Sequence, residues 1–535
     1  MTSTKGDTST SRYRRRSPGG AERTPRARPD SAARAPSRSL TIIEALTDHE
    51  LFGRVFQPTA AWSAWRAFLA ALFGLPMSDD QVAIYRGHTG RQRPPEVSAR
   101  EAWVVVGRRG GKSRVAALVA VWLACFKDYR TVLAPGEPGT LMVIAADRRQ
   151  ARVVFRYIEG LLDGVPMLAS LVGHRTRESI TLTNRVTIEV HTASFRAIRG
   201  YTLIGAVCDE LAFWSSEDSA NPDTEILAGL RPGMATVPGA LLLCISSAYA
   251  RRGALWEAYR EHWGQDDDPV LVWKADTRAM NPTVDEQVVA EAYARDESAA
   301  RAEYGAEFRR DLEDYVGREA LMAVVARDRR ELPPSLFYRH LAFVDPSGGS
   351  VDSMTLAIAH VERDKLVLDA LREAQPPFSP EVVVEQFAQV LGEYRIRGVT
   401  GDRYAGEWPR ERFRAHGIAY QPADKAKSQI YAELLPLLNS GAVELLDHRR
   451  LLNQLLGLER RTSWGGRESV DHPPNAHDDV ANAAAGALLL AWGGRRRTRL
   501  FVSEDRPIIT PVEAPGATPT LDLPVTGPDV HTRHF

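Results

Sequence analysis

The sequence predicts an α/β protein with two sheets, and three features of the chain indicate this fold class. Between residues 40 and 331, short apolar runs alternate with helical stretches, which is typical of a mostly parallel sheet covered by helices on both faces. The prolines after Leu332 then interrupt the pattern and mark a domain boundary. Beyond them, a strand at 340–345 and an apolar hairpin at 354–371 indicate a mixed sheet.

The expected elements follow from these runs. Five buried strands are predicted in the first half, at residues 103–107, 140–146, 186–192, 203–210 and 240–248. In the second half, the pattern predicts a helix at 379–395, a strand ending at Asp402, and a small apolar helix from about Asp478 to Trp492.

Composition sets the broad class of the protein. The chain has 535 residues, is 44% hydrophobic and 25% charged, and carries no net charge, which excludes a wholly disordered chain, a collagen-like fibre and a coiled-coil rod. Residues 1–39 are rich in Arg, Ser, Pro and Ala and strongly basic, so we expect a disordered tail that either contacts a polyanion or is simply solvated. Residues 496–535 are expected to form a flexible C-terminal tail.

The cysteines and the hydropathy of the sequence indicate the cellular compartment in which the protein is expected. Cys125, Cys208 and Cys244 lie in apolar runs without metal-type or redox-type spacing, which predicts buried thiols in a reducing compartment. No run is long enough for a membrane span, and no secretion signal is recognisable, so we expect neither a membrane partner nor secretion.

A glycine-rich turn joins the first predicted strand to a helix and predicts a phosphate-binding loop. Glycines let backbone N–H groups close around phosphate oxygens, and the helix N-terminus adds its positive dipole end. Lys112 is expected to reach the β- and γ-phosphates of ATP, and Ser113 to hold Mg²⁺. Val106 stands where the general motif has its first glycine, so an ordinary strand-to-helix turn is the alternative. The predicted loop consists of Gly107, Arg108, Arg109, Gly110, Gly111, Lys112 and Ser113.

Two later strand ends fit the same site. The strand at 203–210 ends in Asp209, which is expected to assist Mg²⁺, and Glu210, which is expected to polarise the attacking water. The strand at 240–248 carries Ser246 and Ser247, which are candidates to sense the γ-phosphate. A plain strand end is the alternative in both cases.

Acidic residues at three element ends of the second half predict a nuclease. Asp345 and Asp402 end strands and Asp478 opens a helix, an order that an RNase H-like nuclease requires. Oxygen ligands suit Mg²⁺ or Mn²⁺, and two such ions support phosphodiester cleavage. Each acid is also explained as a strand end or a helix cap. Asp479 is an alternative ligand to Asp478.

Other polar residues near these acids are weaker candidates. Asp352 is either an auxiliary metal ligand or a solvated charge, and we favour the second interpretation. His472 and His477 are interpreted as hydrogen-bonding groups, because they lack zinc-type spacing. Lys425 and Lys427 are either DNA-phosphate contacts or surface lysines.

Taken in order, these motifs resemble one family, the large terminase subunit of tailed bacteriophages. The resemblance covers about residues 45–495 and is strongest over 103–113, 199–210, 340–356 and 470–490. It implies a P-loop ATPase domain at 40–331 followed by an RNase H-like endonuclease domain at 332–495. ATP hydrolysis would drive double-stranded DNA into a procapsid, and the nuclease would cut concatemeric DNA at the start and end of packaging.

The resemblance also implies roles and partners. Arg108 matches a loop arginine that touches the γ-phosphate, and Glu210 the catalytic acid, while Ser246 and Ser247 match the coupling motif. Asp345, Asp402 and Asp478 match the nuclease triad. The implied partners are the portal protein, a small terminase subunit and further copies of the chain in a ring, in the host cytoplasm and transiently at the portal vertex.

Parts of the resemblance are loose. Arg199-Gly200 matches an Arg-Gly step of unassigned role, and an adenine-contacting motif is matched only roughly, by Phe56-Gln57-Pro58 with Trp62 and Trp65. A P-loop helicase or repair ATPase with a fused nuclease, an inactive prophage remnant that only docks the portal, and an RNase H-like transposase are the alternatives. The last does not explain the phosphate loop, and the intact Lys112 and Glu210 argue against a remnant.

Overall fold

The computed structural model describes residues 40–193, 198–214, 219, 221–402, 407–462, 467–474 and 476–502, with side chains up to Gly493. The predicted tail at 1–39 and most of the predicted C-terminal tail lie outside these ranges. The last helix, α17 (Asp479–Val502), continues past Trp492 into the segment expected to be a tail.

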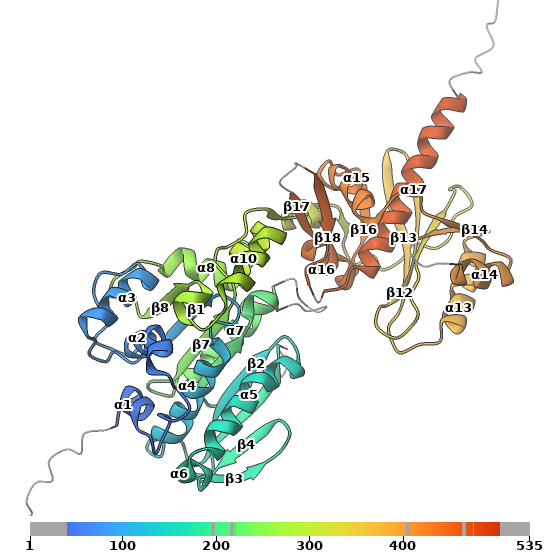
Figure 1. The fold of residues 1–535 in the computed structure, drawn as a ribbon. Coiled ribbons are helices and arrows are strands. Elements are labelled where there is room, and N and C mark those ends of the chain that lie inside the picture. The colour runs from blue at the N-terminus through green and yellow to red at the C-terminus, as the bar shows by residue number, and fades with distance from the viewer. Residues whose placement is uncertain are drawn as a thin grey trace, which may run out of the picture.

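A mostly parallel sheet of eight strands organises the first half, in the order β3-β4-β5-β2-β6-β7-β1-β8 (Figure 1). Only the pairs β3–β4 and β4–β5 are antiparallel. The predicted parallel α/β fold is confirmed, although β3, β4 and β8 were not predicted. The strands are β1 (Glu101–Val106), β2 (Gly139–Ala145), β3 (Val172–Arg175), β4 (Ser179–Leu182), β5 (Val186–Thr192), β6 (Leu203–Asp209), β7 (Leu241–Ser246) and β8 (Val270–Ala275).

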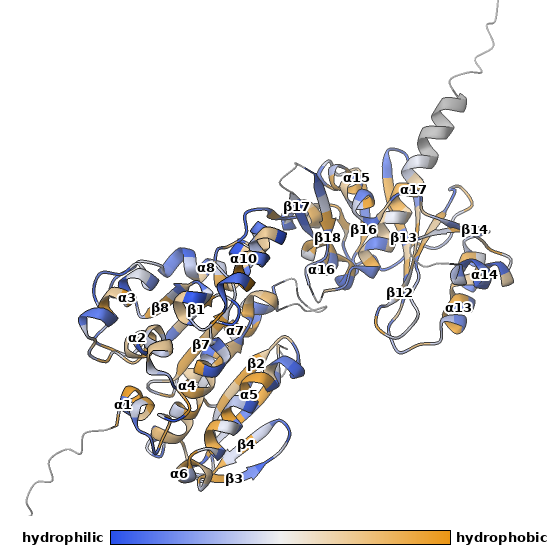
Figure 2. Ribbon diagram, in the orientation of Figure 1, coloured by the Kyte–Doolittle hydropathy of each residue, from blue (hydrophilic) through white to orange (hydrophobic). Residues whose placement is uncertain are grey.

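Helices cover both faces of this sheet, as the continuous apolar strands require. Val104 of β1 packs into a core with α4 (Lys112–Phe126) and α5 (Arg148–Asp163), whereas its neighbour Val105 packs into a core on the opposite face with α7 (Pro222–Met234) and α8 (Gly253–His262). The strands at the centre of this sheet are accordingly coloured largely as hydrophobic (Figure 2). The remaining helices of this half are α1 (Ile42–Thr47), η1 (Thr59–Trp62), α2 (Ser63–Leu72), α3 (Asp79–Thr89), α6 (Pro166–Ala169), η2 (Leu211–Phe213), α9 (Thr277–Met280), α10 (Glu286–Arg295) and α11 (Glu297–Glu303).

The second half contains a mixed sheet of seven strands, in the order β10-β16-β13-β12-β11-β14-β15. The predicted hairpin is present as the antiparallel pair β12–β13, and β11 pairs antiparallel with β12 but parallel with β14. A small sheet, β18-β17-β9, lies beside it. The strands are β9 (Leu312–Asp314), β10 (Val325–Ala326), β11 (Leu341–Asp345), β12 (Met354–Glu362), β13 (Lys365–Ala374), β14 (Gly398–Gly401), β15 (Ala419–Pro422), β16 (Val443–Leu446), β17 (Glu459–Thr462) and β18 (Glu468–Asp471).

Helix α17 packs against one face of the mixed sheet, and α13 (Pro380–Glu393) covers the other. Phe343 of β11 faces α17, and its neighbours Ala342 and Val344 face α13. The other helices here are α12 (Arg318–Ala323), α14 (Trp408–Ala415), α15 (Lys427–Asn439) and α16 (Arg449–Gly457).

Pairing with the second half begins before the proline-rich break. Strand β9 pairs with β17, and β10 pairs with β16, so the segment from Leu312 onward is built into the second unit. The boundary at residue 331 stays a prediction for domains that fold independently.

The structure also bears on the predicted buried cysteines and on the search for membrane spans. Cys208 and Cys244 are buried and free, and Cys125 is half-buried and free. In the part of the chain that the structure describes, no helix has the length and apolarity that crossing a bilayer demands.

The contact between α17 and β11 generates a stability prediction. A Cβ added at Gly486 would lie 2.4 Å from the Phe343 ring, whereas a Cβ at Gly493 of the same helix would meet nothing within 4 Å. We expect Gly486→Ala to destabilise the second unit by about 1–3 kcal/mol through overpacking. Gly493→Ala, the matched control, is expected to stabilise by up to about 1 kcal/mol through helix propensity. Calorimetric unfolding of both variants measures this, and equal shifts would contradict the packing argument.

Candidate active sites

The glycine-rich loop has the shape that a phosphate cradle requires. A Cβ at Gly107 would lie 2.3 Å from Thr277 Oγ1, and one at Gly110 would lie 2.5 Å from Val106 Cγ1, so both positions need the absence of a side chain. Gly111, just before α4, has φ +98°, which a glycine adopts without strain. Arg109 also has a positive φ, of 64°.

Side chains from other elements hold the loop in place. Thr277 Oγ1 donates to the Arg108 carbonyl over 2.7 Å, and Asn281 Nδ2 donates to the Arg109 carbonyl over 2.8 Å. Trp65 Nε1, from buried α2, donates to the Gly110 carbonyl over 2.8 Å. Because side chains from other elements donate to three carbonyls of the loop, the protein itself fixes the conformation of the loop.

Lys112 is a buried cation with partners from three elements. Its Nζ donates to the Val106 carbonyl at 2.7 Å and to Ser247 Oγ at 3.1 Å. Nζ also lies 3.4 Å from Glu210 Oε1. The predicted loop lysine, coupling serine and catalytic acid therefore form one cluster.

Glu210 completes that cluster from the end of β6. Its Oε2 accepts from the Ser247 backbone N–H at 2.9 Å and from Ser246 Oγ at 3.2 Å. Its backbone is left-handed, with φ +49°, which is uncommon outside glycine and concentrates at functional sites. Strand β7 lies between β6 and β1, and this places the serines between Glu210 and the loop.

Asp209 has the character of a cation ligand. The residue is 2% exposed, and its Oδ1 has no hydrogen-bond partner among the described residues. Burial, and then the charge of Glu210, raise the pKa of Asp209 to about 7. A buried carboxylate oxygen without a partner needs a compensating charge, so the donor set here fits Mg²⁺ beside the loop.

Arg108 and Ser113 of the loop, and the candidate adenine-contacting residues, lie outside this cluster of side chains. Arg108 is exposed and forms an ion pair with Glu303 at 3.2 Å, so in this structure it is held by α11. Ser113 is the second residue of α4 and is half-buried. Of the loosely matched adenine residues, Phe56 and Trp62 pack edge to face with ring centroids 4.8 Å apart.

The second half brings two of its predicted acids together through an asparagine. Asp345 ends β11, and Asp402 follows β14, which pairs parallel with β11. Asn482 Nδ2, from the first turn of α17, donates to Asp345 Oδ2 at 2.8 Å and to Asp402 Oδ2 at 3.3 Å. Burial above all, and then the charges of Asp479, Asp402 and Asp478, raise the pKa of Asp345 well above its usual range.

Asp478 and Asp479 differ in environment. Asp478 is buried and ion-paired with Lys427 Nζ at 3.1 Å, and it accepts from the Tyr431 hydroxyl at 2.9 Å. Asp479 accepts a longer bond, of 3.3 Å, from the Ser353 N–H. Burial and the charge of Asp478 raise the pKa of Asp479 to about 6.

The acids gather without closing into one tight ligand shell. Within the described ranges, the oxygens of Asp345, Asp402 and the 478–479 pair do not all lie within 4.8 Å of one another. Like charges repel, and the amide of Asn482 lies between Asp345 and Asp402, while Lys427 pairs with Asp478. Asn482 Oδ1 is buried without a hydrogen-bond partner among the described residues, so it adds an oxygen to a donor set that fits a hard divalent cation.

Neighbouring residues have structural roles. Lys427 bonds to both Asp471 and Asp478, and although burial disfavours its charge, these carboxylates raise its pKa. His477 Nδ1 lies 3.3 Å from Asp352, and His472 Nε2 lies 4.0 Å from Asp478. Lys425 pairs with Glu433.

Comparison with solved structures gives likenesses of fold. The chain is similar to the large terminase of bacteriophage HK97, with 16% identity and a TM-score of 0.35, over 79% of this chain and 93% of that one. It is similar to the large terminase of a thermophilic bacteriophage, with 12% identity and a TM-score of 0.35, over 79% and 96% of the two chains. The large terminase nuclease of another thermophilic phage, G20c, with bound magnesium, is similar over 32% of this chain and 94% of its own, with 17% identity and a TM-score of 0.29.

These likenesses concern the same family that the motifs resemble. No family model and no curated protein matches the sequence. Identities and TM-scores this low leave activity to be argued from the side chains of this chain.

The bond from Trp65 to the loop generates the next prediction. Trp65→Phe keeps the ring in the core but removes the donor to the Gly110 carbonyl, and loss of one buried hydrogen bond corresponds to about a tenfold weaker affinity. We therefore expect ATP to bind about tenfold more weakly, as measured by titration calorimetry. Trp122→Phe, at a buried tryptophan of α4 stacked on Phe126, is the control and should leave the affinity unchanged. Equal affinities in both variants would contradict the positioning role.

Proposed function

We propose that this chain is a DNA-packaging motor subunit that hydrolyses ATP in its first half and cuts DNA with a metal-dependent endonuclease in its second half. The observation that supports it best is the cluster at the ends of β1, β6 and β7. There, Glu210 lies within hydrogen-bond distance of both coupling serines and 3.4 Å from Lys112. A phosphate loop, a catalytic acid and a sensing strand in mutual contact are the parts of an ATPase that couples hydrolysis to movement.

In the first half, each residue has a stated task. Backbone N–H groups of Arg109 and residues 111–113, together with the Lys112 ammonium, bind the phosphates of ATP, and the Arg108 side chain leaves Glu303 to reach the γ-phosphate. Ser113 and Asp209 hold Mg²⁺, which neutralises phosphate charge when bound. Glu210 exchanges its bond to Lys112 for the attacking water, which it polarises. Ser246 and Ser247 contact Glu210 and so respond when the γ-phosphate leaves.

In the second half, Asp345, Asp402 and Asp479 hold the divalent cations, with Asp478 as a further ligand when Lys427 releases it. Bound Mg²⁺ or Mn²⁺ supplies an activated water and stabilises the leaving oxygen of the phosphodiester. Asn482 fixes the orientation of Asp345 and Asp402. The carboxylates in this half argue against a helicase, because a helicase is expected to carry a second motor domain there.

The proposed substrate and partners follow from the family resemblance. They are concatemeric double-stranded DNA, a portal protein, a small terminase subunit and further copies of this chain in a ring. The proposed place of action is the host cytoplasm and, transiently, the portal vertex of the procapsid.

The ATPase assignment is tested at Glu210 and Lys112. Glu210→Gln keeps the shape of the side chain but removes its basicity, so ATP turnover should fall at least about a hundredfold. Lys112→Ala should abolish turnover by removing the phosphate contact. Phosphate release measures both, and the exposed Glu257→Gln is the control. Plasmid cleavage should persist in all three variants, and wild-type turnover in Glu210→Gln would refute the motor assignment.

The nuclease assignment is tested at Asp345. Asp345→Asn should abolish Mn²⁺-dependent plasmid cleavage and leave ATP turnover intact, because the charge that holds the cation is lost. Asp352→Asn, at an exposed acid of the same region, should cut at the wild-type rate. A fully active Asp345→Asn variant removes this residue from the site.

The variants Asp478→Asn and Asp479→Asn test which of the two neighbouring acids binds the metal. We expect Asp479→Asn to cause the larger rise in the Mn²⁺ concentration that half-maximal plasmid cleavage requires.

A further inference from the structure

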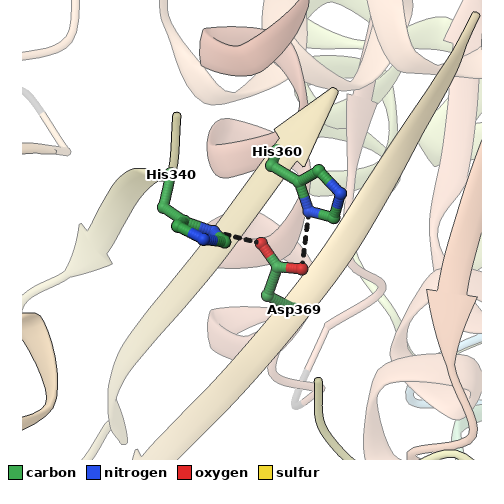
Figure 3. Close-up of side chains that lie close together, drawn as sticks. All are labelled: His340, His360 and Asp369. Carbon is green, nitrogen blue, oxygen red and sulfur yellow. Dashed lines mark hydrogen bonds and ion pairs between the residues drawn. The ribbon is translucent and has the colours of Figure 1, made fainter. Parts of the chain in front are cut away.

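A buried cluster of two histidines and one aspartate lies in the mixed sheet, away from the acids described above. His340 precedes β11, His360 lies on β12 and Asp369 lies on β13 (Figure 3). His340 Nδ1 is 2.9 Å from Asp369 Oδ2, and His360 Nδ1 is 2.7 Å from Asp369 Oδ1. The three side chains are 3%, 4% and 1% exposed, and one donor atom from each lies within 4.8 Å of the others.

A β-bulge directs Asp369 toward the histidines. Ala359 pairs with Leu368, and Ile358 pairs with Ala370, so Asp369 is the extra residue of β13 without a cross-strand partner. Leu368 and Ala370 consequently pack into cores on opposite faces of the sheet, although they are two residues apart. Bulges redirect side chains at sites with a specific role. Here the bulge brings a carboxylate to face one imidazole from the neighbouring strand β12 and one from the residue just before β11.

The charge of Asp369 calls for a cation. A carboxylate at 1% exposure is stable only when its charge is paired. In the part of the chain that the structure describes, the ion-pair partners of Asp369 are His340 and His360, with no lysine or arginine among them. Neutral imidazoles donate hydrogen bonds but do not neutralise the charge.

We propose that His340, His360 and Asp369 bind one transition-metal ion of the Zn²⁺ class. Two imidazole nitrogens and one carboxylate oxygen are a ligand set that zinc accepts, and a water completes a tetrahedron. Mg²⁺ and Ca²⁺ prefer oxygen ligands throughout, so the site selects against the cations proposed for the acids. On binding, each Nδ1 exchanges its bond to Asp369 for a bond to the metal, and the ring proton moves to Nε2.

The surroundings of both rings support this exchange. His340 Nε2 accepts from the Ser335 N–H at 3.1 Å and lies 3.2 Å from the Ser335 carbonyl oxygen. On metal binding it gives up the first bond and donates to this carbonyl, as metal-bound histidines commonly do. His360 Nε2 is buried and has no hydrogen-bond partner among the described residues, so no neighbour opposes a proton there. His340 also lines a cavity of about 490 Å³ with Tyr338, Tyr394, Arg397 and Gln421, which gives the ion an approach from solvent.

The metal would fasten the segment after the proline break to the sheet. The Leu332 N–H donates to the Asp369 carbonyl at 2.8 Å, and the Tyr338 ring stacks on His360 at 4.3 Å between centroids. His340 and Asp345 lie at opposite ends of β11, so the two sites are roughly 15 Å apart by strand geometry. The proposed site is therefore structural and separate from DNA cleavage.

Zinc content of the full-length protein tests the proposal. The chain is stripped with a chelator, dialysed against micromolar Zn²⁺ with millimolar Mg²⁺, and analysed by plasma mass spectrometry. We expect about one zinc per wild-type chain, and at least about tenfold weaker retention in His340→Gln and His360→Gln. His416→Gln, at an exposed histidine of the same unit, is the matched control and should retain zinc. Asp345→Asn should also retain zinc, which separates this site from the proposed nuclease.

The outcomes that would overturn the proposed zinc site follow from its ligand set. A wild-type chain that retains no zinc overturns the proposal, as does a folded His360→Gln chain with wild-type zinc content. If the histidine variants do not fold, Co²⁺ in the wild-type chain gives the answer. The intense visible absorption of tetrahedral cobalt supports the site, and the weak absorption of octahedral cobalt alone refutes it.

Discussion

The level alignment of three parallel strands is the constraint on which the first site depends. Val105 of β1 pairs with Ser246 of β7, and Ile245 of β7 pairs with Asp209 of β6. The three strands therefore end at the same height, and the residues after each end meet at one edge of the sheet. Lys112, Ser247 and Glu210 are in contact because of this register rather than because of any local sequence feature. Since a shift of two residues would move these groups by roughly 7 Å, the apolar packing of the strands is what holds the chemistry together.

The mixed sheet solves a different problem, which is to hold like charges near one another. Parallel pairing of β11 with β14 brings Asp345 and Asp402 to one edge, where their repulsion opposes folding. The amide of Asn482 offsets part of this repulsion by donating to both carboxylates. Lys427 and Tyr431 do the same for Asp478. These carboxylates are thus stabilised by neutral and cationic donors that a divalent ion would replace.

The sequence predicted the strands that carry the candidate sites and the charged groups at their ends, but neither the edge strands β3, β4 and β8 nor the residues that position the charged groups. Strand ends are visible in apolar runs, so Asp209, Asp345 and Ser246 were found. Asn482 stands four residues after Asp478, a spacing that puts both on one helix face, and this was the available signal for it. Trp65 was interpreted from its spacing either as an adenine-contacting residue or as a core residue of a helix, because a hydrogen bond to the Gly110 carbonyl across 45 residues leaves no trace in the local pattern. Asp369 was hidden for another reason, since only the bulge register separates it from an ordinary strand position.

The segment that follows β7 links the first site to the second unit. Ser247 contacts Lys112 and Glu210, and two residues later the Tyr249 hydroxyl donates to Glu459 of β17 at 2.8 Å. Arg252 pairs with the same Glu459 and with Asp314 of β9. Burial raises the pKa of Glu459 despite the nearby Arg252, so this carboxylate depends on its partners for its charge. Removing one partner from a buried ion pair leaves the other uncompensated, so breaking the contact between Arg252 and Glu459 is energetically costly. The short stretch from Ser247 to Arg252 therefore connects the nucleotide-facing edge of the eight-stranded sheet directly to β17, in the small sheet of the second half.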